Sequence, residues 1–234
     1  MIPLKDNIPS YRFPIVNYVI ISVNSLVFIY QYIFSNKSFY EIENFIYSYG
    51  FIPYRFITDF SSSWWSLFTS MFLHGGFWHF LGNMWFLYIF GDNVEDRFGH
   101  FKYLIIYITC GLTGSLFQFL LNPTSRIPMI GASGAISGVL GAYFVFFPSA
   151  GILTLVPFGI FSRIVVVPAV IFLGLWIIFQ FLSGTQNLMI KAALGRDLPG
   201  VAYWAHIGGF LCGVVIAFKT RKKRRIKTYW RYIW

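Results

Sequence analysis

Long apolar runs separated by short polar connections dominate this chain of 234 residues. Several runs are close to the roughly 20 residues that a helix needs to cross a hydrocarbon core about 30 Å thick. We expect six spans, at residues 14–34, 77–90, 101–121, 131–147, 165–182 and 201–218. The pattern therefore predicts an all-α membrane protein with a bundle of six transmembrane helices.

The connection between the first two expected spans, residues 35–72, differs from the others. It is long and weakly charged, and it carries Pro53, the pair Trp64 and Trp65, and many other aromatic residues. A loop in water rarely has this composition, whereas Trp and Tyr are enriched where a membrane meets water. We expect this connection to lie partly in the membrane interface.

Composition agrees with a membrane location, because 57% of the residues are hydrophobic and only 11% are charged, against about 25% charged in a typical soluble domain. The net charge of +10 is unevenly placed, since eight of the 18 Lys and Arg residues lie within residues 219–234. A basic stretch directly after a span is typical of a cytoplasmic anchor at anionic lipid, so we expect no nucleic-acid partner. An even number of spans then places both termini in the cytoplasm.

The chain divides into a cytoplasmic N-terminal segment (residues 1–13), one six-span domain (14–218) and a basic cytoplasmic tail (219–234). We expect the first span to be retained and not removed as a signal peptide. Cys110 and Cys212 lie in apolar runs without CxxC spacing, so we expect no disulfide and no redox motif. The expected location is a prokaryotic cytoplasmic membrane.

Polar side chains near or inside the expected spans point to chemistry, because hydrocarbon offers them no hydrogen-bond partner. The unusual ones are His74, His79, Asn83, Ser133 and His206. Each of the second, fourth and sixth spans carries at least one of them near its outer end, and all three spans enter from the outer side in this topology. We therefore expect one site that these three spans share.

The fourth span is short, since its 17 residues make a helix of roughly 26 Å at about 1.5 Å per residue. We expect its N-terminal end to be recessed below the outer surface, with residues 122–128 descending to it as extended chain. Irregular backbone at such a depth needs protein or a water-filled cavity beside it. Ser133, on the first turn, would be surrounded by free backbone N–H groups.

Ser133 and His206 have the residue types for acyl transfer at an amide. His206 lies six residues inside Gly200, roughly 9 Å along a helix axis, a depth compatible with a recessed Ser133. The imidazole would take the serine proton, and the Ser133 backbone N–H with His79 and Asn83, which share one helix face, would bind the oxyanion. The spans contain no Asp or Glu to orient His206, so we predict a catalytic dyad.

Three motifs resemble those of the rhomboid family of intramembrane serine proteases. Residues 131–134 read GASG, like the family's GxSG nucleophile motif, and residues 205–209 read AHIGG, like its histidine span. His74 followed by HFLGN at 79–83 is similar to the family's H-x4-H-x3-N pattern, and EDR at 95–97 to its short acidic-x-basic element. The likeness covers residues 14–218 in the same order.

This resemblance implies a rhomboid-like bundle with a short, recessed fourth helix and an endopeptidase without cofactor or metal. Ser133 would be the nucleophile, His206 the general base, and His79 and Asn83 oxyanion-hole residues. Structural support would come from His74, Gly131, Gly134, Gly209, Gly213, Glu95 and Arg97. Glu95 and Arg97 are expected as a stabilising cytoplasmic pair. Substrates would be the transmembrane segments of single-span proteins, cut near the outer face, with the fifth span and residues 183–200 as lateral gate and cap.

Two positions depart from the family pattern. Ser66 stands where a Trp-Arg pair would place arginine, so the anchor of the first connection is altered. Ser137 stands where many members have an aromatic side chain that stacks on the histidine. The orientation of His206 is therefore open at this point.

Each feature also has a plainer interpretation. The GASG segment belongs to a small-residue face that favours close helix packing, and a lone His206 often bridges helices by a hydrogen bond. His74 and His79 would lie about 140° apart on a helix, which disfavours a metal site. The alternative functions are a catalytically inactive rhomboid-like protein that binds membrane segments, or a small transporter with His79 and His206 as proton relay. The oligomeric state is open.

Overall fold

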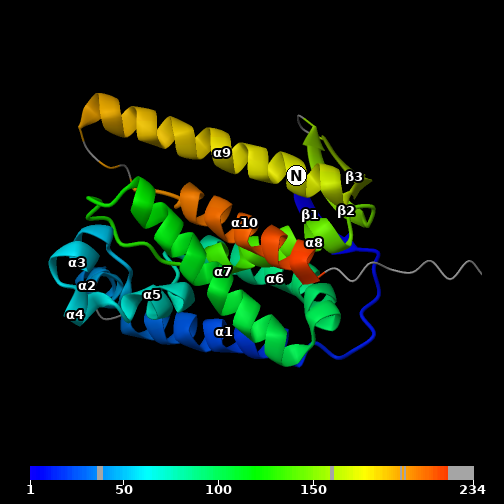
Figure 1. Ribbon diagram of the computed structural model, residues 1–234, viewed down its shortest axis with the longest axis horizontal. Helices are drawn as coiled ribbons and strands as arrows, with labels where there is room; N and C mark the ends of the chain where they lie inside the picture. Colours follow the sequence, from blue (N-terminus) through cyan, green and yellow to red (C-terminus); the bar gives the residue numbers. More distant parts are fainter. Residues whose placement is uncertain (36–38, 159–160, 196, 198, 221–234) are drawn as a thin grey trace, which may run out of the picture.

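The computed structural model describes residues 1–35, 39–158, 161–195, 197 and 199–220. Long helices form the body of the molecule, and a small sheet lies beside the N-terminal end of one of them (Figure 1). The long helices are α1 (Ile15–Ser35), α6 (Phe77–Phe98), α7 (His100–Leu121), α8 (Ser133–Phe146), α9 (Ala169–Leu194) and α10 (Tyr203–Thr220). The predicted, mainly helical fold is confirmed.

Four of the described helices, α1, α7, α9 and α10, are long and apolar enough to cross a membrane, and α8 is a shorter apolar helix. The other long helix, α6, continues eight residues beyond its predicted end and carries Asp92, Glu95, Asp96 and Arg97 in its last turns. The six crossings therefore stay a prediction. The basic tail lies outside the described residues, apart from Lys219 and Thr220 at the end of α10.

Helix α8 is the centre of the bundle, where it packs directly against α10. A Cβ atom on Gly209 would lie 2.0 Å from the carbonyl oxygen of Gly134, and one on Gly213 would lie 1.9 Å from that of Gly138. The two backbones are in contact, so these positions admit only glycine without a shift of the helices. Gly209 and Gly213 have the GxxxG spacing that is typical of such close contacts between helices.

The sheet was not predicted. Strands β1 (Ile2–Asp6), β2 (Gly151–Phe158) and β3 (Phe161–Pro168) are antiparallel in that order. The predicted start of the fifth span at residue 165 is wrong, because the β-branched run of residues 164–167 lies in β3 and α9 begins at Ala169. The segment 1–13 thus contributes a strand, and Asp6 at its end accepts a hydrogen bond of 2.5 Å from the Tyr143 hydroxyl of α8.

The first connection folds into short helices. These are α2 (Phe39–Tyr49), α3 (Pro53–Thr58), α4 (Phe60–Ser63), α5 (Ser66–Thr69) and the 3-10 turn η1 (Ser70–Phe72). Arg55 anchors them, because its guanidinium donates to the carbonyl oxygens of Tyr47 (2.7 Å) and Gly50 (2.9 Å) at the end of α2. Position 66, where the family pattern has an arginine, is a serine in this chain. Arg55 is the arginine that anchors the first connection here.

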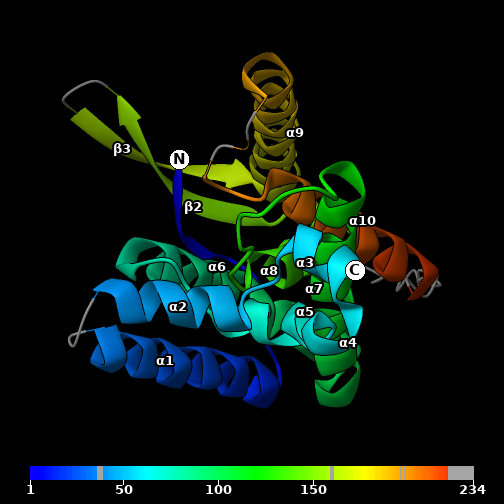
Figure 2. The same ribbon diagram turned by 90° about the vertical axis from the view of Figure 1, so that its left-hand side faces the viewer.

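Figure 2 shows α9 nearly end-on and apart from α1, which lies on the opposite side of the bundle. Between them stand α8 and α10, whose first turns carry Ser133 and His206. The fold therefore places the two predicted catalytic residues in its interior, on helices in backbone contact.

Candidate active site

The chain enters α8 along a path fixed by main-chain hydrogen bonds. Met129 and Phe51 exchange N–H to carbonyl bonds of 3.0 and 2.7 Å, and the Gly131 N–H donates to Ser70 O at 2.8 Å. Gly131 has φ +121°, a backbone conformation that favours glycine. As expected, this irregular segment lies against protein, here the first connection, and it delivers Ser133 to the first position of the helix.

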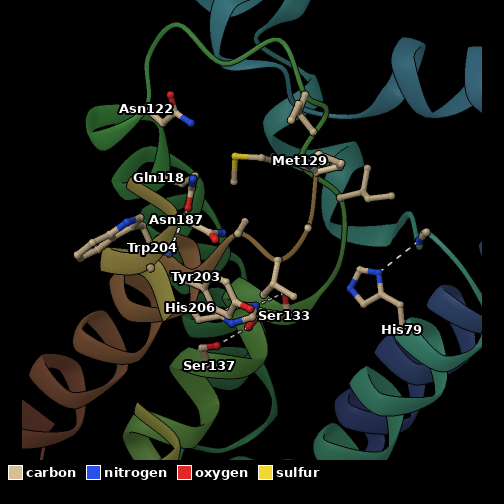
Figure 3. A pocket seen from close by; sticks show the side chains of 18 of the residues that line it. His79, Gln118, Asn122, Met129, Ser133, Ser137, Asn187, Tyr203, Trp204 and His206 are labelled. Carbon is tan, nitrogen blue, oxygen red and sulfur yellow. Dashed lines mark hydrogen bonds between the residues drawn. The ribbon is translucent and has the colours of Figure 1, made fainter. Parts of the chain in front are cut away.

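Ser133 and His206 are in direct contact. His206 Nε2 lies 2.8 Å from Ser133 Oγ, a hydrogen-bonding distance, although the two residues are 73 positions apart in sequence. His206 is buried. Figure 3 shows the two side chains side by side at one end of the pocket. The structure thus brings together the pair that the sequence selected from separate helices.

The other side of the imidazole contacts α9, which sequence reasoning did not include in the site. Gln180 Oε1 lies 2.7 Å from His206 Nδ1. The Trp176 ring stacks on the imidazole with a centroid distance of 5.9 Å and an interplanar angle of 27°. Ser137 instead donates to the Ser133 carbonyl oxygen at 2.6 Å. The aromatic partner absent at position 137 is therefore supplied by another helix.

His79 faces the start of α8 from α6. The Gly75 N–H donates to His79 Nδ1 at 3.3 Å, so in the neutral ring the hydrogen is on Nε2. A Cβ atom on Gly131 would lie 2.8 Å from His79 Nε2 and 3.6 Å from Ser133 Oγ. A donor nitrogen and the serine hydroxyl therefore border the same small space, which a larger residue at position 131 would fill.

Asn83 lies one turn after His79 and is buried. Its Nδ2 donates to the His79 carbonyl oxygen at 2.9 Å, which uses one of its two N–H groups and leaves the second for another acceptor. Asn83, His79, Ser133 and His206 all line one cavity of about 730 Å³. Three separate helices thus present four polar side chains to one space.

Part of the remaining cavity lining comes from α9 and the chain that follows it. Lys191 pairs with Asp197 at 2.9 Å, and Asn122, at the end of α7, donates to Asp197 at 2.9 Å. Burial raises the pKa of Asp197, but the Asn122 hydrogen bond and the Lys191 ammonium outweigh it, so the net shift is downward. The carboxylate stays charged, and the pair connects the end of α9 to the segment that leads to Ser133.

Comparison with known proteins identifies the family. The model of the rhomboid domain matches residues 61–223, which is more than half of the chain and includes every candidate site residue. The chain belongs to the rhomboid family. It is 30% identical over 184 residues to rhomboid protein 1, mitochondrial, of Saccharomyces cerevisiae, which covers 74% of this chain and 49% of that protein.

Two further rhomboid relatives come from a plant and a bacterium. RHOMBOID-like protein 6, mitochondrial, of Arabidopsis thaliana is 32% identical over 159 residues, covering 66% of this chain and 43% of that protein. Rhomboid protease GluP of Bacillus subtilis is 43% identical over 79 residues, 34% of this chain and 15% of that protein. The chain thus spans about half or less of the length of these relatives.

His74 lies behind the rhomboid site and not in the cavity lining. Gln31 of α1 clamps its backbone, accepting from the His74 N–H at 3.0 Å and donating to its carbonyl oxygen at 3.2 Å. Its ring lies edge-on to His79 with centroids 5.3 Å apart. Burial, followed by the neighbouring His79, lowers the pKa of His74 to about 3. A neutral His74 therefore packs against His79, and its predicted structural role stays a prediction.

Glu95 and Arg97 have separate partners in the structure and are not paired with each other. Glu95 accepts the N–H groups of Val16 and Asn17 at 2.9 and 2.7 Å, and it contacts His100. Arg97 lies over the Phe146 ring, 5.3 Å from its centroid. Residues two apart on a helix do not face each other, so each stabilises a different neighbour: Glu95 the start of α1, and Arg97 the end of α8.

Proposed function

We propose that this chain is an intramembrane serine endopeptidase that cleaves transmembrane segments of single-span proteins near the outer face. The observation that carries the proposal is the 2.8 Å contact between Ser133 Oγ and His206 Nε2 inside a cavity. A hydroxyl is a poor nucleophile until a base takes its proton. A serine hydroxyl and a buried imidazole at this distance have the geometry for that transfer.

Catalysis would follow two acyl-transfer steps. His206 Nε2 takes the Ser133 proton as Oγ attacks the peptide carbonyl, and the protonated ring then gives that proton to the leaving amine. A water molecule, deprotonated by His206, hydrolyses the acyl-serine and restores both residues. Ser133 and His206 alone carry out these proton transfers, so they form a catalytic dyad. Gln180, which contacts the other nitrogen of the ring, is an amide and does not ionise.

The oxyanion would form beside α8. The Ser133 N–H lies in the first turn, where backbone donors have no partner within the helix. His79 Nε2 and the second N–H of Asn83 are the side-chain donors that border the same space. Donors that are already fixed in place stabilise the charge that develops in the transition state.

We further propose six membrane crossings within residues 14–218, both termini in the cytoplasm, and a basic tail at anionic lipid. The short length of α8 supports a recessed serine, since its 14 residues make roughly 21 Å of helix. The names of two matched relatives place those proteins in mitochondria, so the comparisons do not support the prokaryotic cytoplasmic membrane expected from the sequence.

The intact serine–histidine contact favours a protease over an inactive membrane-segment binder, which has no need of it. A transporter with His79 and His206 as relay is less well supported, because His206 Nε2 and Nδ1 are already engaged by Ser133 and Gln180.

Labelling with a fluorophosphonate tests the proposal, because the reagent reacts with activated serines. We expect labelling of the purified protein in lipid, none for Ser133→Ala, and at least a hundredfold slower labelling for His206→Ala, since the base is lost. Mass spectrometry should place the adduct on Ser133. If the wild-type protein shows a normal thermal unfolding transition, and is therefore folded, but is not labelled, the enzyme hypothesis is rejected and the inactive membrane-segment binder is favoured.

A further inference from the structure

Both nitrogens of the His206 ring have partners, and together they define one tautomer. An amide oxygen only accepts, so the 2.7 Å contact with Gln180 Oε1 requires the hydrogen on Nδ1. Nε2 of the neutral ring then carries the lone pair and accepts from Ser133 Oγ–H at 2.8 Å. This is the protonation state that a general base toward serine must have.

A second contact from the same helix fixes the plane of the ring. Trp176 is one helical turn before Gln180, so both side chains project from one face of α9. The indole stacks on the imidazole at an angle of 27° while Gln180 reaches its edge. The position of the ring is therefore set by α9 in two directions, although His206 itself belongs to α10.

The seating of α9 against α10 has its own structural basis. At Gly184, one turn beyond Gln180, a Cβ atom would lie 3.2 Å from Trp204 and Tyr203 at the start of α10. A larger residue would press α9 away from α10 at the level of the histidine. The absence of a side chain here keeps Gln180 within reach of the ring.

We propose that Gln180 is a positioning residue of the active site, which holds His206 in the Nδ1–H tautomer with Nε2 directed at Ser133. This inference rests on the proposed function and extends the dyad by a neutral third group on α9. An amide suits a membrane interior, because a buried carboxylate there is strongly unfavourable unless it is paired. Gln180 selects the tautomer without adding a charge.

The direct test measures which nitrogen of the His206 ring carries the hydrogen. The chain has four histidines, so the ¹⁵N signals of histidine-labelled protein in lipid nanodiscs can be assigned by comparison with His206→Ala. We expect His206 to be protonated at Nδ1 and unprotonated at Nε2 in the neutral ring. Gln180→Leu, which keeps the size but removes the acceptor, should give a mixture of tautomers, and Gln180→Glu, which keeps an acceptor, should recover the Nδ1–H form.

Gln186→Leu is the matched control, since it makes the same change at an exposed position of the same helix. It should leave the His206 signals unchanged. A wild-type ring with its hydrogen on Nε2, or a Gln180→Leu ring identical to wild type, would overturn the proposal. This readout needs no turnover, so it is independent of whether the chain proves to be a protease.

Kinetics separate positioning from a general loosening of the bundle. For cleavage of a membrane substrate, Gln180→Leu should lower kcat roughly two- to tenfold, the effect of one neutral hydrogen bond, with KM nearly unchanged. Gln180→Glu should restore part of kcat, and Gln186→Leu should match wild type. Equal losses in the two leucine variants, or a change in KM alone, would contradict the role.

Discussion

The two sides of the catalytic histidine are built differently. On one side α8 and α10 touch backbone to backbone, and 11 of the 14 residues of α8 are buried. On the other side stands α9, of whose 26 residues four are buried, and whose outer face carries exposed Ile171, Ile178, Phe179 and Leu182. The serine–histidine distance is fixed by a close-packed core, whereas the orientation of the ring depends on a peripheral helix.

The difference indicates which part of the site can shift while the fold stays intact. Contact between helix backbones leaves no room for adjustment, because any shift creates overlap or a void. Helix α9 contacts the core chiefly through α10 and, at its end, through Asn122, which accepts from Lys191 and donates to Asp197. Its displacement would leave Ser133 and His206 on their helices and remove Gln180 and Trp176 from the ring.

The largest expected effect, a loss of both stability and turnover, comes from the rigid side of the histidine, where α8 packs against α10. Gly209→Ala places a methyl group 2.0 Å from the Gly134 carbonyl oxygen, so α10 must move away from α8 at a cost of roughly 1–3 kcal/mol. Thermal unfolding should occur about 3–10 °C lower, and turnover should fall about a hundredfold because the dyad separates. Gly174→Ala is the control on α9, where nothing lies within 4 Å. If both variants behave alike, the contrast between the two sides is wrong.

The oxyanion assignment places the next effect on α6. Asn83→Ala should lower turnover by about 10- to 1,000-fold if the amide donates to the oxyanion, with little change in unfolding temperature. Asn187→Ala is the matched change on α9, at a residue that lines the same cavity, and we expect a much smaller loss. An unchanged rate in Asn83→Ala would remove this residue from the catalytic machinery.

The pH dependence of turnover distinguishes a neutral from an ionisable third group. Because Gln180 does not titrate, activity should rise with pH through one histidine-like step, about tenfold per unit at its acidic end, and then level off. The rate of fluorophosphonate labelling should follow the same curve. A flat profile would count against His206 as base, and a second acidic step would show that another ionisable group assists it.

The smallest effect concerns the sheet, whose first strand contacts the core through Asp6. Burial raises the pKa of Asp6 to about 6, although the Tyr143 hydrogen bond opposes this, and the nearby Asp92 adds to it. A folded-state pKa above the ordinary value of 3.8 means that folding favours the protonated acid, so this stabilisation is lost as pH rises from about 4 through 6. Asp6→Asn should therefore raise the unfolding temperature by about 2–4 °C at pH 7.5 and by less at pH 4.5. An equal or opposite difference at the two pH values would contradict this sign.

Much of the rigid side could be predicted from the sequence, and most of the α9 side could not. GASG, AHIGG and the spacing of His79 and Asn83 predict three helices and their polar faces, because ionisable side chains such as histidine are rare in membrane spans and the small residues around Ser133 and His206 have the spacing of a helix contact. Gln180 carries the same signal, a polar side chain inside an expected span, yet nothing in its spacing indicates that it reaches a ring on the next helix.

The sheet and the true start of α9 illustrate a second limit. Residues 164–167 are as apolar as a membrane helix, and an apolar run alone does not distinguish a strand from a span. Only the pairing with β2, and of β2 with β1 from the other end of the chain, decides between them. Such long-range pairing leaves no local mark in the sequence. The anchoring role of Arg55 likewise depends on the packing of α3 against the end of α2, which the sequence does not indicate.

Cleavage of a single-span membrane protein in liposomes tests the central claim most directly. Purified wild-type chain and Ser133→Ala, reconstituted at equal density with the substrate, should differ completely: the wild type yields two fragments cut within or beside the membrane segment, and the variant yields none. Fragments produced equally by both proteins, or by neither while both remain folded, would contradict the assignment of Ser133 as the nucleophile of an intramembrane protease.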